Sequence, residues 1–330
     1  MAVILLGLAV QNFFDPRIVK ENKPVVTEEQ TDNSIKHPLS GEILAEEADF
    51  FAIAVMIDNA YDVRPQYGLA EADIIYEALA ESHITRLIAI FDSQKDIDKI
   101  GPVRSARNYY MDWVEEYNGV YMHVGGSPQA LSVIDDYDFV NIDQIGSGEI
   151  YFWRDNNFDA PHNVFTSDSN WLRVGEMKEP NKVKQSIAWN FVDVPAEALE
   201  ETPERIDFIV NFGSETYRVD WKFNDKIDAY QRWQGGEKFL HSTGEQAKVD
   251  NVIVQVVDSH LIDEERRGMD TQKGGKVFVL NVFGLQQGEW KVEDGRTRFY
   301  DANNEEIKLV SGKTWVEIIN DEDGLIMIRE

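Results

Sequence analysis

Two hydrophobic patterns divide the chain. Between residues 50 and 190, apolar runs of strand length alternate with segments of helical spacing. The run Phe50–Ile57 (FFAIAVMI) is typical of a strand buried on both faces, and Ile84–Phe91 is also strand-like. Periodicity does not decide whether Ala72–Ala80 is a helix or a strand. Because strands alternate with helices here, we expect an α/β domain with a mixed sheet.

Helices are expected at three places in this region. The longest is Arg104–Tyr117, which carries large aromatic residues at helical intervals. Gln129–Tyr137 and Ser169–Met177 are shorter helical candidates, and the short run Val120–Val124 is strand-like. The helices are therefore expected to be few and to separate the strands.

The pattern changes after residue 205. Short strand-like runs, the first at Ile206–Phe212 and the last at Thr314–Ile319, are separated by clusters of Gly, Asn and Asp. The pair Asp294–Gly295 between two such runs is a strong hairpin signal. We therefore expect a second, mostly antiparallel β domain, either a sandwich or a partly open barrel, which makes the whole chain α+β or α/β.

These patterns predict the organisation of the chain. We expect an apolar N-terminal segment with a polar spacer (1–47), an α/β domain that carries the polar motifs (48–177), a linker (178–204), a β-rich domain (205–322) and a tail (323–330). The initial MAVILLGLAV is shorter than the roughly 20 residues that span a bilayer, and no basic stretch precedes it. It is either the end of a membrane anchor or signal segment, or a short buried strand or helix. The polar composition of Asp15–Glu47 suits a spacer and favours the anchor.

Composition and charge exclude several classes of function. The chain has 330 residues with 60 Asp and Glu against 32 Lys and Arg, a formal charge of −28. Such a negative field repels DNA and RNA, so we expect no nucleic-acid partner. The chain has no cysteine, which excludes disulfides, thiolate zinc sites and a cysteine nucleophile. No cofactor-binding motif is present, and we expect no cofactor.

The segment GPVRSAR (101–107) is the first motif with chemical content. Pro102 suits the first turn of a helix, which would place Arg104 and Arg107 three residues apart on one face near its N-terminus. Arginines at that end add to backbone donors and suggest an anion site. The anion is either a ligand phosphate or carboxylate, or an Asp or Glu of the chain itself.

The segment HVGGSP (123–128) is a second junction between a strand and a helix. Ser127 fits a helix N-cap better than a nucleophile, and Pro128 fits the first helical position. Gly125 and Gly126 would allow a ligand to approach the backbone. His123, near a strand end, is either an acid/base or ligand contact or a structural histidine.

A polar loop, RDNNFDAPHN (154–163), follows. Arg154, His162 and Asn163 make it a plausible edge of an active site, and Ala160–Pro161 could be a cis bond. The alternative is a turn whose side chains cap its own backbone. Metal binding through His123 or His162 with nearby aspartates is a weaker hypothesis, because no metal-ligand spacing is present, and we expect no metal.

Charged residues in the apolar strands complete the candidate set. Arg86 lies inside a strand-like run and needs a partner, which Glu77 or Glu81 could supply. Asp58 ends the first apolar run, where ligands collect in open α/β sheets.

The ordered motifs resemble a known family. The runs PQYGL (65–69), ADIIYE (72–77), TR (85–86), GPVRSAR, HVGGSPQA and APHN, followed by NVIV (251–254), GG (274–275), GEW (288–290) and GKTW (312–315), are similar to those of the YerB-like bacterial cell-envelope lipoproteins. This is a domain-of-unknown-function family, and the resemblance covers residues 50–320. It implies two domains and an extracytoplasmic, membrane-anchored location, but no established reaction. This chain departs from the family in lacking the lipid-modified cysteine.

Three functions follow from these observations. The first is binding of an anionic or polar envelope ligand, such as glycan, a peptide carboxylate or phosphate. Its site residues would be drawn from Arg86, Arg104, Arg107, Gly125, Gly126, Ser127, Arg154 and Asn163. The second is an envelope hydrolase or transferase, with His123 or His162 as acid/base, Asp58 or Glu77 as its orienter and Arg104 with Arg107 as an anion clamp. The third is a protein-interaction scaffold. We expect the protein to contact the membrane through an N-terminal anchor alone.

Overall fold

The structure, a computed structural model, describes residues 34–328 except 48, 147, 195–205 and 264–265. The apolar start of the chain, whichever of its two interpretations is correct, lies outside the described residues. No helix among the described residues has the length and apolar character needed to cross a bilayer.

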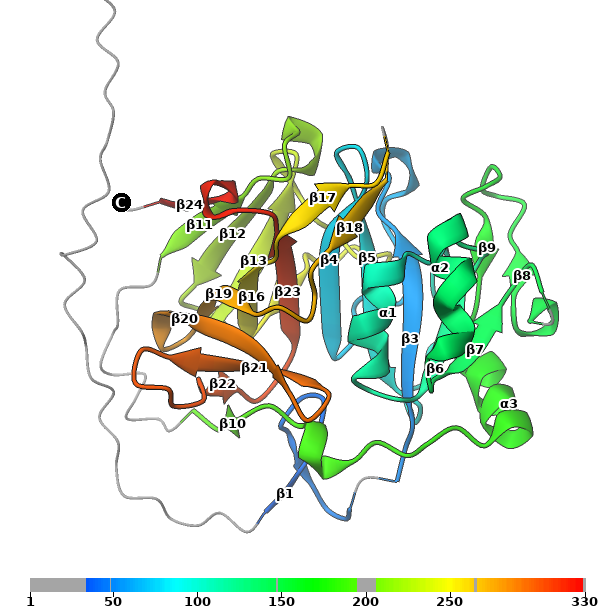
Figure 1. Ribbon diagram of the computed structural model, residues 1–330, viewed down its shortest axis with the longest axis horizontal. Helices are drawn as coiled ribbons and strands as arrows, with labels where there is room; N and C mark the ends of the chain where they lie inside the picture. Colours follow the sequence, from blue (N-terminus) through cyan, green and yellow to red (C-terminus); the bar gives the residue numbers. More distant parts are fainter. Residues whose placement is uncertain (1–33, 48, 147, 195–205, 264–265, 329–330) are drawn as a thin grey trace, which may run out of the picture. The chain divides into compact units, whose positions relative to one another are not determined.

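One mixed sheet of ten strands runs through both halves of the chain (Figure 1). Its strand order is β21-β20-β19-β16-β23-β4-β5-β3-β6-β7. The five strands from the first half are β3 (Ala52–Asp58), β4 (Ile74–Glu81), β5 (Ile84–Asp92), β6 (Val120–His123) and β7 (Val140–Asp143). The five from the second half are β16 (Asn251–Val256), β19 (Gly275–Asn281), β20 (Gly284–Glu293), β21 (Arg296–Asp301) and β23 (Thr314–Ile319).

The two halves meet at β4 and β23. These strands are parallel, with Thr314 opposite Ile74 and Glu317 opposite Glu77. The segment whose period was ambiguous is therefore a strand, β4, paired on both sides and buried along almost its whole length. A strand enclosed in this way has no polar face, which explains why its sequence does not alternate.

A second sheet covers part of the first. It has six strands in the order β14-β13-β12-β11-β24, with β15 paired to β13. Their bounds are β11 (Asp207–Val210), β12 (Val219–Asn224), β13 (Ala229–Gln234), β14 (Glu237–Lys238), β15 (Lys248–Val249) and β24 (Leu325–Ile328). The rings of Trp221 and Trp315 lie 5.6 Å apart, so β12 packs against β23 of the ten-stranded sheet. Residues 325–328, which we had assigned to a tail, form β24 on the edge of this sheet.

Helices pack against the first half of the ten-stranded sheet. They are α1 (Asn108–Glu115), α2 (Pro128–Val133) and α3 (Asp168–Lys178). The Tyr110 hydroxyl of α1 donates to the carbonyls of Ala78 and Arg86, and Trp113 stacks on Tyr76 at 5.5 Å. These contacts fix α1 over β4 and β5.

The helix expected from Arg104 begins four residues later, at Asn108. The peptide bond between Gly101 and Pro102 is cis, and the following backbone is extended. The Val103 amide donates to the Val164 carbonyl, and the Arg104 amide donates to the Met56 carbonyl. Because neighbouring strands take up these backbone groups, the prediction that Arg104 and Arg107 share a helix face was wrong.

The remaining strands form small pairs. These are β1 (Ile35–Lys36) with β2 (Ile43–Leu44), β8 (Trp153–Arg154) with β9 (Val164–Phe165), β10 (Phe191–Val192) with β22 (Leu309–Val310), and β17 (Ser259–Leu261) with β18 (Arg267–Met269). Short 3-10 helices lie at Tyr61–Val63, Ile134–Asp136, Glu149–Tyr151, Gln185–Ile187, Glu215–Tyr217 and Glu322–Gly324. The pairing of β10 with β22 attaches the described part of the expected linker to the second half. The architecture confirms the predicted fold class, a mixed-sheet α/β part followed by mostly antiparallel strands.

Candidate functional site

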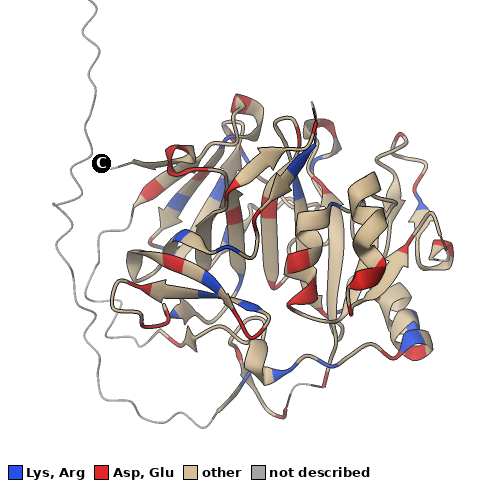
Figure 2. Ribbon diagram, viewed as in Figure 1, with Lys and Arg blue, Asp and Glu red and all other residues tan. Residues whose placement is uncertain are grey.

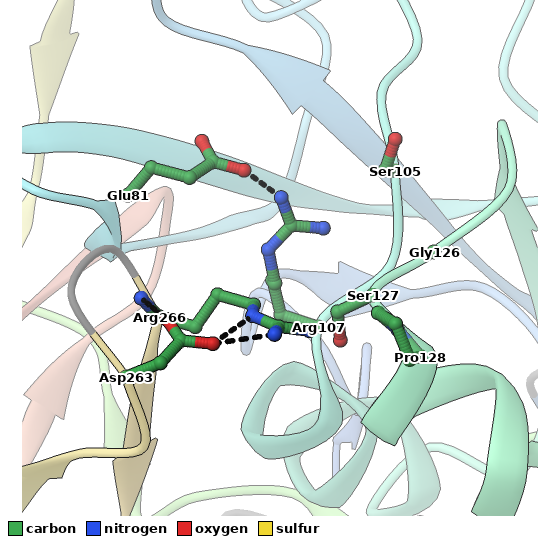
Figure 3. A pocket seen from close by; sticks show the side chains of 8 residues that line it. All are labelled: Glu81, Ser105, Arg107, Gly126, Ser127, Pro128, Asp263 and Arg266. Atoms are coloured by element: carbon green, nitrogen blue, oxygen red, sulfur yellow. Dashed lines mark hydrogen bonds and ion pairs between the residues drawn. The ribbon is translucent and has the colours of Figure 1, made fainter.

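A polar cavity of about 580 Å³ lies where the two halves of the chain meet (Figure 3). We call it the Arg107 cavity, and it is lined by Glu81, Ser105, Arg107, Gly126, Ser127, Pro128, Asp263 and Arg266. Four separate parts of the chain supply these residues: the end of β4, the extended segment before α1, the turn before α2 and the β17–β18 hairpin. A backbone bridge between Glu81 and Arg266 fixes the hairpin to β4. Figure 2 shows the basic residues at the start of β18.

The cavity lining contains two arginines and two carboxylates, and the buried Arg86 behind it adds a third guanidinium group. The carboxylate of Glu81 pairs with Arg107 and also accepts two hydrogen bonds from Arg86, so one negative charge faces two guanidinium groups. Across the cavity, Arg266 pairs with Asp263 and donates to Gln129 at 2.9 Å. Burial lowers the pKa of Arg107 below its ordinary value. Counting Arg86, three guanidinium groups and two carboxylates therefore surround the cavity, in a chain whose formal charge is −28.

The turn before α2 has the predicted capping geometry. The Ser127 hydroxyl accepts a hydrogen bond from the Ala130 amide, and Pro128 is the first helical residue. Gly126 lines the cavity, whereas the Gly125 amide donates to Asp143 at 2.6 Å and is occupied within the protein. A Cβ at Gly126 would lie 3.0 Å from the Leu131 side chain, so little space remains there for a larger residue. Ser127 is thus an N-cap, and Gly126 is the glycine that borders the cavity.

A second polar cluster forms around Asp58, at the end of β3. One carboxylate oxygen of Asp58 lies 2.5 Å from Nδ1 of His162 and 3.1 Å from Nε of Arg104. Asp58 is buried, whereas the His162 side chain is 24% exposed. The other ring nitrogen of His162 has no hydrogen-bond partner among the described residues. This arrangement brings together one histidine, one orienter and one arginine of the predicted enzyme site.

The loop that carries His162 also contains Arg154 and Asn163. Arg154 donates to the Asn163 side chain at 2.7 Å and to Gln144 at 3.4 Å. The bond between Ala160 and Pro161 is cis, as the sequence suggested. Arg154 therefore bonds to Asn163 of its own loop and to Gln144 outside it, and neither Arg154 nor Asn163 lines the Arg107 cavity.

Two candidate catalytic residues, His123 and Glu77, are buried and hydrogen-bonded within the protein. His123 is completely buried, with one ring nitrogen 2.8 Å from the Gly125 carbonyl and the other 2.7 Å from the Asn141 side chain. Glu77 is also completely buried and accepts hydrogen bonds from Asn59, Thr85 and Arg232 rather than from a histidine. The structure therefore does not place either residue where it could meet a ligand. Arg86 is buried as well and takes Glu81, one of its two predicted partners.

Five lining residues were not among the predicted site residues: Glu81, Ser105, Pro128, Asp263 and Arg266. Ser105 lies inside the GPVRSAR motif, which we had searched only for its arginines. The available signal for Arg266 was the pair Arg266–Arg267 in an acidic part of the chain. Its bond to Gln129 spans 137 residues, which no local pattern reveals. No group of three or more potential metal ligands occurs in the part of the chain that the structure describes.

The chain consists of an N-terminal and a C-terminal part, and each part matches a known family model. Residues 39–181 match the family model described as the N-terminal domain of "Protein of unknown function (DUF3048)", and residues 208–316 match the corresponding C-terminal domain. The chain belongs to this YerB-like family. It is 32% identical over 278 residues to "Putative lipoprotein YerB" of Bacillus subtilis (strain 168), covering 82% of each chain. The crystal structure of the Bacillus subtilis YerB protein is similar, with a TM-score of 0.78, 28% identity, and coverage of 89% of this chain and all of that one.

Proposed function

We propose that this chain is an extracytoplasmic envelope protein, tethered to the membrane at its N-terminus, that binds an anionic ligand in the Arg107 cavity. The name of the Bacillus subtilis relative, "Putative lipoprotein YerB", supports the location and the tether. The ligand class follows from one observation, the excess of guanidinium groups over carboxylates around the cavity.

The ion pairs inside the cavity serve to orient the arginines. Glu81 and Asp263 hold Arg107 and Arg266 in place, so little side-chain entropy remains to be lost when an anion arrives. Arginine presents several donors in a rigid fork, which suits phosphate and carboxylate groups. The Ser105 and Ser127 side chains border the same space and add polar groups.

Phosphate and glycerol phosphate are the probes that test this proposal. Isothermal titration should show binding by the full chain that weakens with salt, as expected for partly exposed charges. Arg107→Ala with Arg266→Ala should reduce the affinity by at least about tenfold, since charge-assisted hydrogen bonds are lost. Arg173→Ala is the matched control, because this exposed arginine on α3 is not at the cavity. Unchanged binding by the double variant would refute the proposal.

A second candidate function rests on a different observation, the 2.5 Å contact between His162 and Asp58. A carboxylate that fixes the tautomer and orientation of a histidine leaves the other ring nitrogen able to exchange a proton with a substrate. Arg104, bonded to the same carboxylate, lies beside the Pro161 carbonyl at 3.5 Å and could face a developing anion. The chemistry would be general acid–base hydrolysis or transfer.

Hydrolysis of bis-p-nitrophenyl phosphate and p-nitrophenyl acetate tests this alternative. If either ester is turned over, His162→Gln should lower the rate by about 10² to 10⁴-fold, the usual contribution of a general acid or base. His123→Gln is the matched control, because that ring is buried and bonded on both sides. A hydrolysis rate that does not depend on His162 would refute the enzymatic alternative. Anion binding in the Arg107 cavity would then remain as the proposed function.

A further inference from the structure

A smaller cavity of about 200 Å³ lies beside β13 and β15, and it shares no lining residue with the Arg107 cavity. Both halves of the chain border it: Ala70 precedes β4, whereas His241, Asp250 and Lys313 come from the second half. Cavities for drug-sized ligands measure about 300–1,000 Å³, so this one suits a molecule of a few heavy atoms. Lys313 belongs to the GKTW segment that the sequence singled out and that neither proposed function uses.

The ammonium group of Lys313 is only partly satisfied. It donates to the Ala70 carbonyl, although an ammonium has three donors. No carboxylate of the described residues forms an ion pair with it. Burial, reinforced by the positive charge of Lys95, lowers the pKa of Lys313 to about 8, although the negative charges of Asp73, Glu71 and Asp250 oppose the shift. The amine is therefore still mostly charged at pH 7 and lacks a counter-ion in contact.

His241 lines the same cavity and contains a second unsatisfied group. Its residue is 8% exposed, and its Nδ1 atom has no hydrogen-bond partner among the described residues. Burial, together with the positive charge of Lys313, lowers the pKa of His241 to about 4. The ring is neutral at pH 7 and can carry its proton on Nδ1, so it can donate one hydrogen bond. Leaving such a buried donor unpaired destabilises the folded chain, and an acceptor on a ligand would relieve this cost.

We propose that this cavity binds the carboxylate group of a small molecule, with the Lys313 ammonium and Nδ1–H of His241 as its donors. One carboxylate satisfies both groups, because it offers two oxygens and a full negative charge. Asp250 and Glu245 line the same space and are the acidic groups that an ammonium group would meet there, although one Asp250 oxygen already accepts a hydrogen bond from the Lys313 amide. A free amino acid therefore fits the cavity better than a simple carboxylate.

The Lys313 amine itself reports on binding. A carboxylate in contact with it favours the charged form, so the pKa of Lys313 should rise when the ligand binds. By linkage, the ligand should bind more tightly below pH 8 than above it. This response is independent of the Arg107 cavity and of the proposed anion binding there.

The test follows the lysine signals of the full chain by NMR with ¹³C-labelled lysine, during pH titrations with L-alanine, acetate or ethylamine. L-Alanine and acetate should raise the pKa of Lys313 by about one unit or more, and ethylamine should not. Lys313→Met should reduce the affinity for L-alanine by at least about tenfold. Lys238→Met, which removes an exposed lysine on β14 outside this cavity, is the matched control.

Two further variants protect the test from a folding artefact. Lys313→Arg keeps the positive charge and should keep the binding, whereas His241→Phe removes the donor, fills the buried site and should weaken it. No response of Lys313 to either carboxylate, or an equal response to ethylamine, would overturn the proposal. So would L-alanine binding that survives both Lys313→Met and His241→Phe in folded protein.

Discussion

Two arginine clusters in this protein contain the same residue types and have different roles. Arg232 of β13 is completely buried, 2.5 Å from Glu77 and 4.0 Å from Glu317. Its guanidinium carbon lies 4.2 Å and 4.4 Å from the ring centroids of Phe239 and Trp315. Arg107, by contrast, borders a cavity and shares Glu81 with Arg86. The two arginines differ in their surroundings, because aromatic rings enclose Arg232 whereas Arg107 borders a cavity.

This difference separates a structural ion pair from a candidate binding site. Arg232 links β13 to the two strands at which the halves of the ten-stranded sheet meet, because Glu77 lies on β4 and Glu317 on β23. A charge buried in this way is costly if its partner is removed. A charge beside a cavity can still be solvated, so its loss should affect ligands more than folding. The comparison can be tested by stability measurements.

The largest expected effect comes from Arg232→Met. This change leaves Glu77 and Glu317 buried without their cation and should lower the free energy of unfolding by about 3–5 kcal/mol. Urea denaturation at pH 7 measures it. Adding Glu77→Gln should restore part of the loss, since it removes the unpaired charge. A loss below about 1 kcal/mol for Arg232→Met, the range of a surface pair, would contradict the structural role.

The second effect is a loss of folding stability at acid pH that is caused by His241. Burial and the positive charges of Lys313 and Arg232 keep this residue neutral in the folded chain. The pKa of His241 is about 4 in the folded chain, against an ordinary value of 6.5. Between these values the unfolded chain binds a proton that the folded chain does not, so stability falls as pH falls. The loss from this group should reach about 3 kcal/mol at the acid end.

Urea midpoints between pH 7 and 4 measure this dependence. His241→Gln does not titrate there and should flatten the profile over this window. Parallel profiles for the two proteins would show that His241 binds a proton equally well in the folded and unfolded chain.

A smaller effect is expected from Glu317→Gln. Burial, together with the negative charge of Glu77, raises the pKa of Glu317 well above its ordinary value. Above pH 4.5 the unfolded chain releases a proton that the folded chain keeps, so this carboxyl contributes less stability as pH rises. Glutamine can still accept the 2.8 Å hydrogen bond from Trp221 and carries no charge. The variant should therefore gain about 1–2 kcal/mol over the natural chain at pH 8 and much less at pH 4.

Melting temperatures at the two pH values check this prediction, with Asp323→Asn as a control for general charge effects at an exposed acidic position. A gain that is the same at pH 4 and pH 8 would mean that Glu317 does not hold an extra proton.

The strands were predictable because a strand that is buried on both faces has an almost continuously apolar sequence. Phe50–Ile57 and Ile84–Phe91 correspond to β3 and β5, and both are almost continuously apolar. The Ser127 cap was also predictable, because capping uses atoms three residues apart. These features depend on local chemistry alone.

The composition of the cavity depends on long-range contacts and was only partly predictable. Arg107, Gly126 and Ser127 were expected at a site, and all three line the cavity. Arg266 reaches it only because the β17–β18 hairpin pairs with the end of β4. Local rules failed at Pro102, where a helix start was expected and strands instead took up the backbone hydrogen bonds.

The smallest expected effect on stability belongs to the cavity itself. Arg107→Ala with Arg266→Ala should lower the free energy of unfolding by no more than about 1 kcal/mol, because both arginines line a cavity and neither is enclosed by the core. Glu81 keeps Arg86 as its partner in this variant, so no buried carboxylate is left unpaired. The same variant should lose at least about tenfold in phosphate affinity. Urea denaturation and isothermal titration on one protein preparation measure both quantities. A loss of stability close to that of Arg232→Met would place Arg107 among the structural ion pairs and remove the physical basis for an anion site.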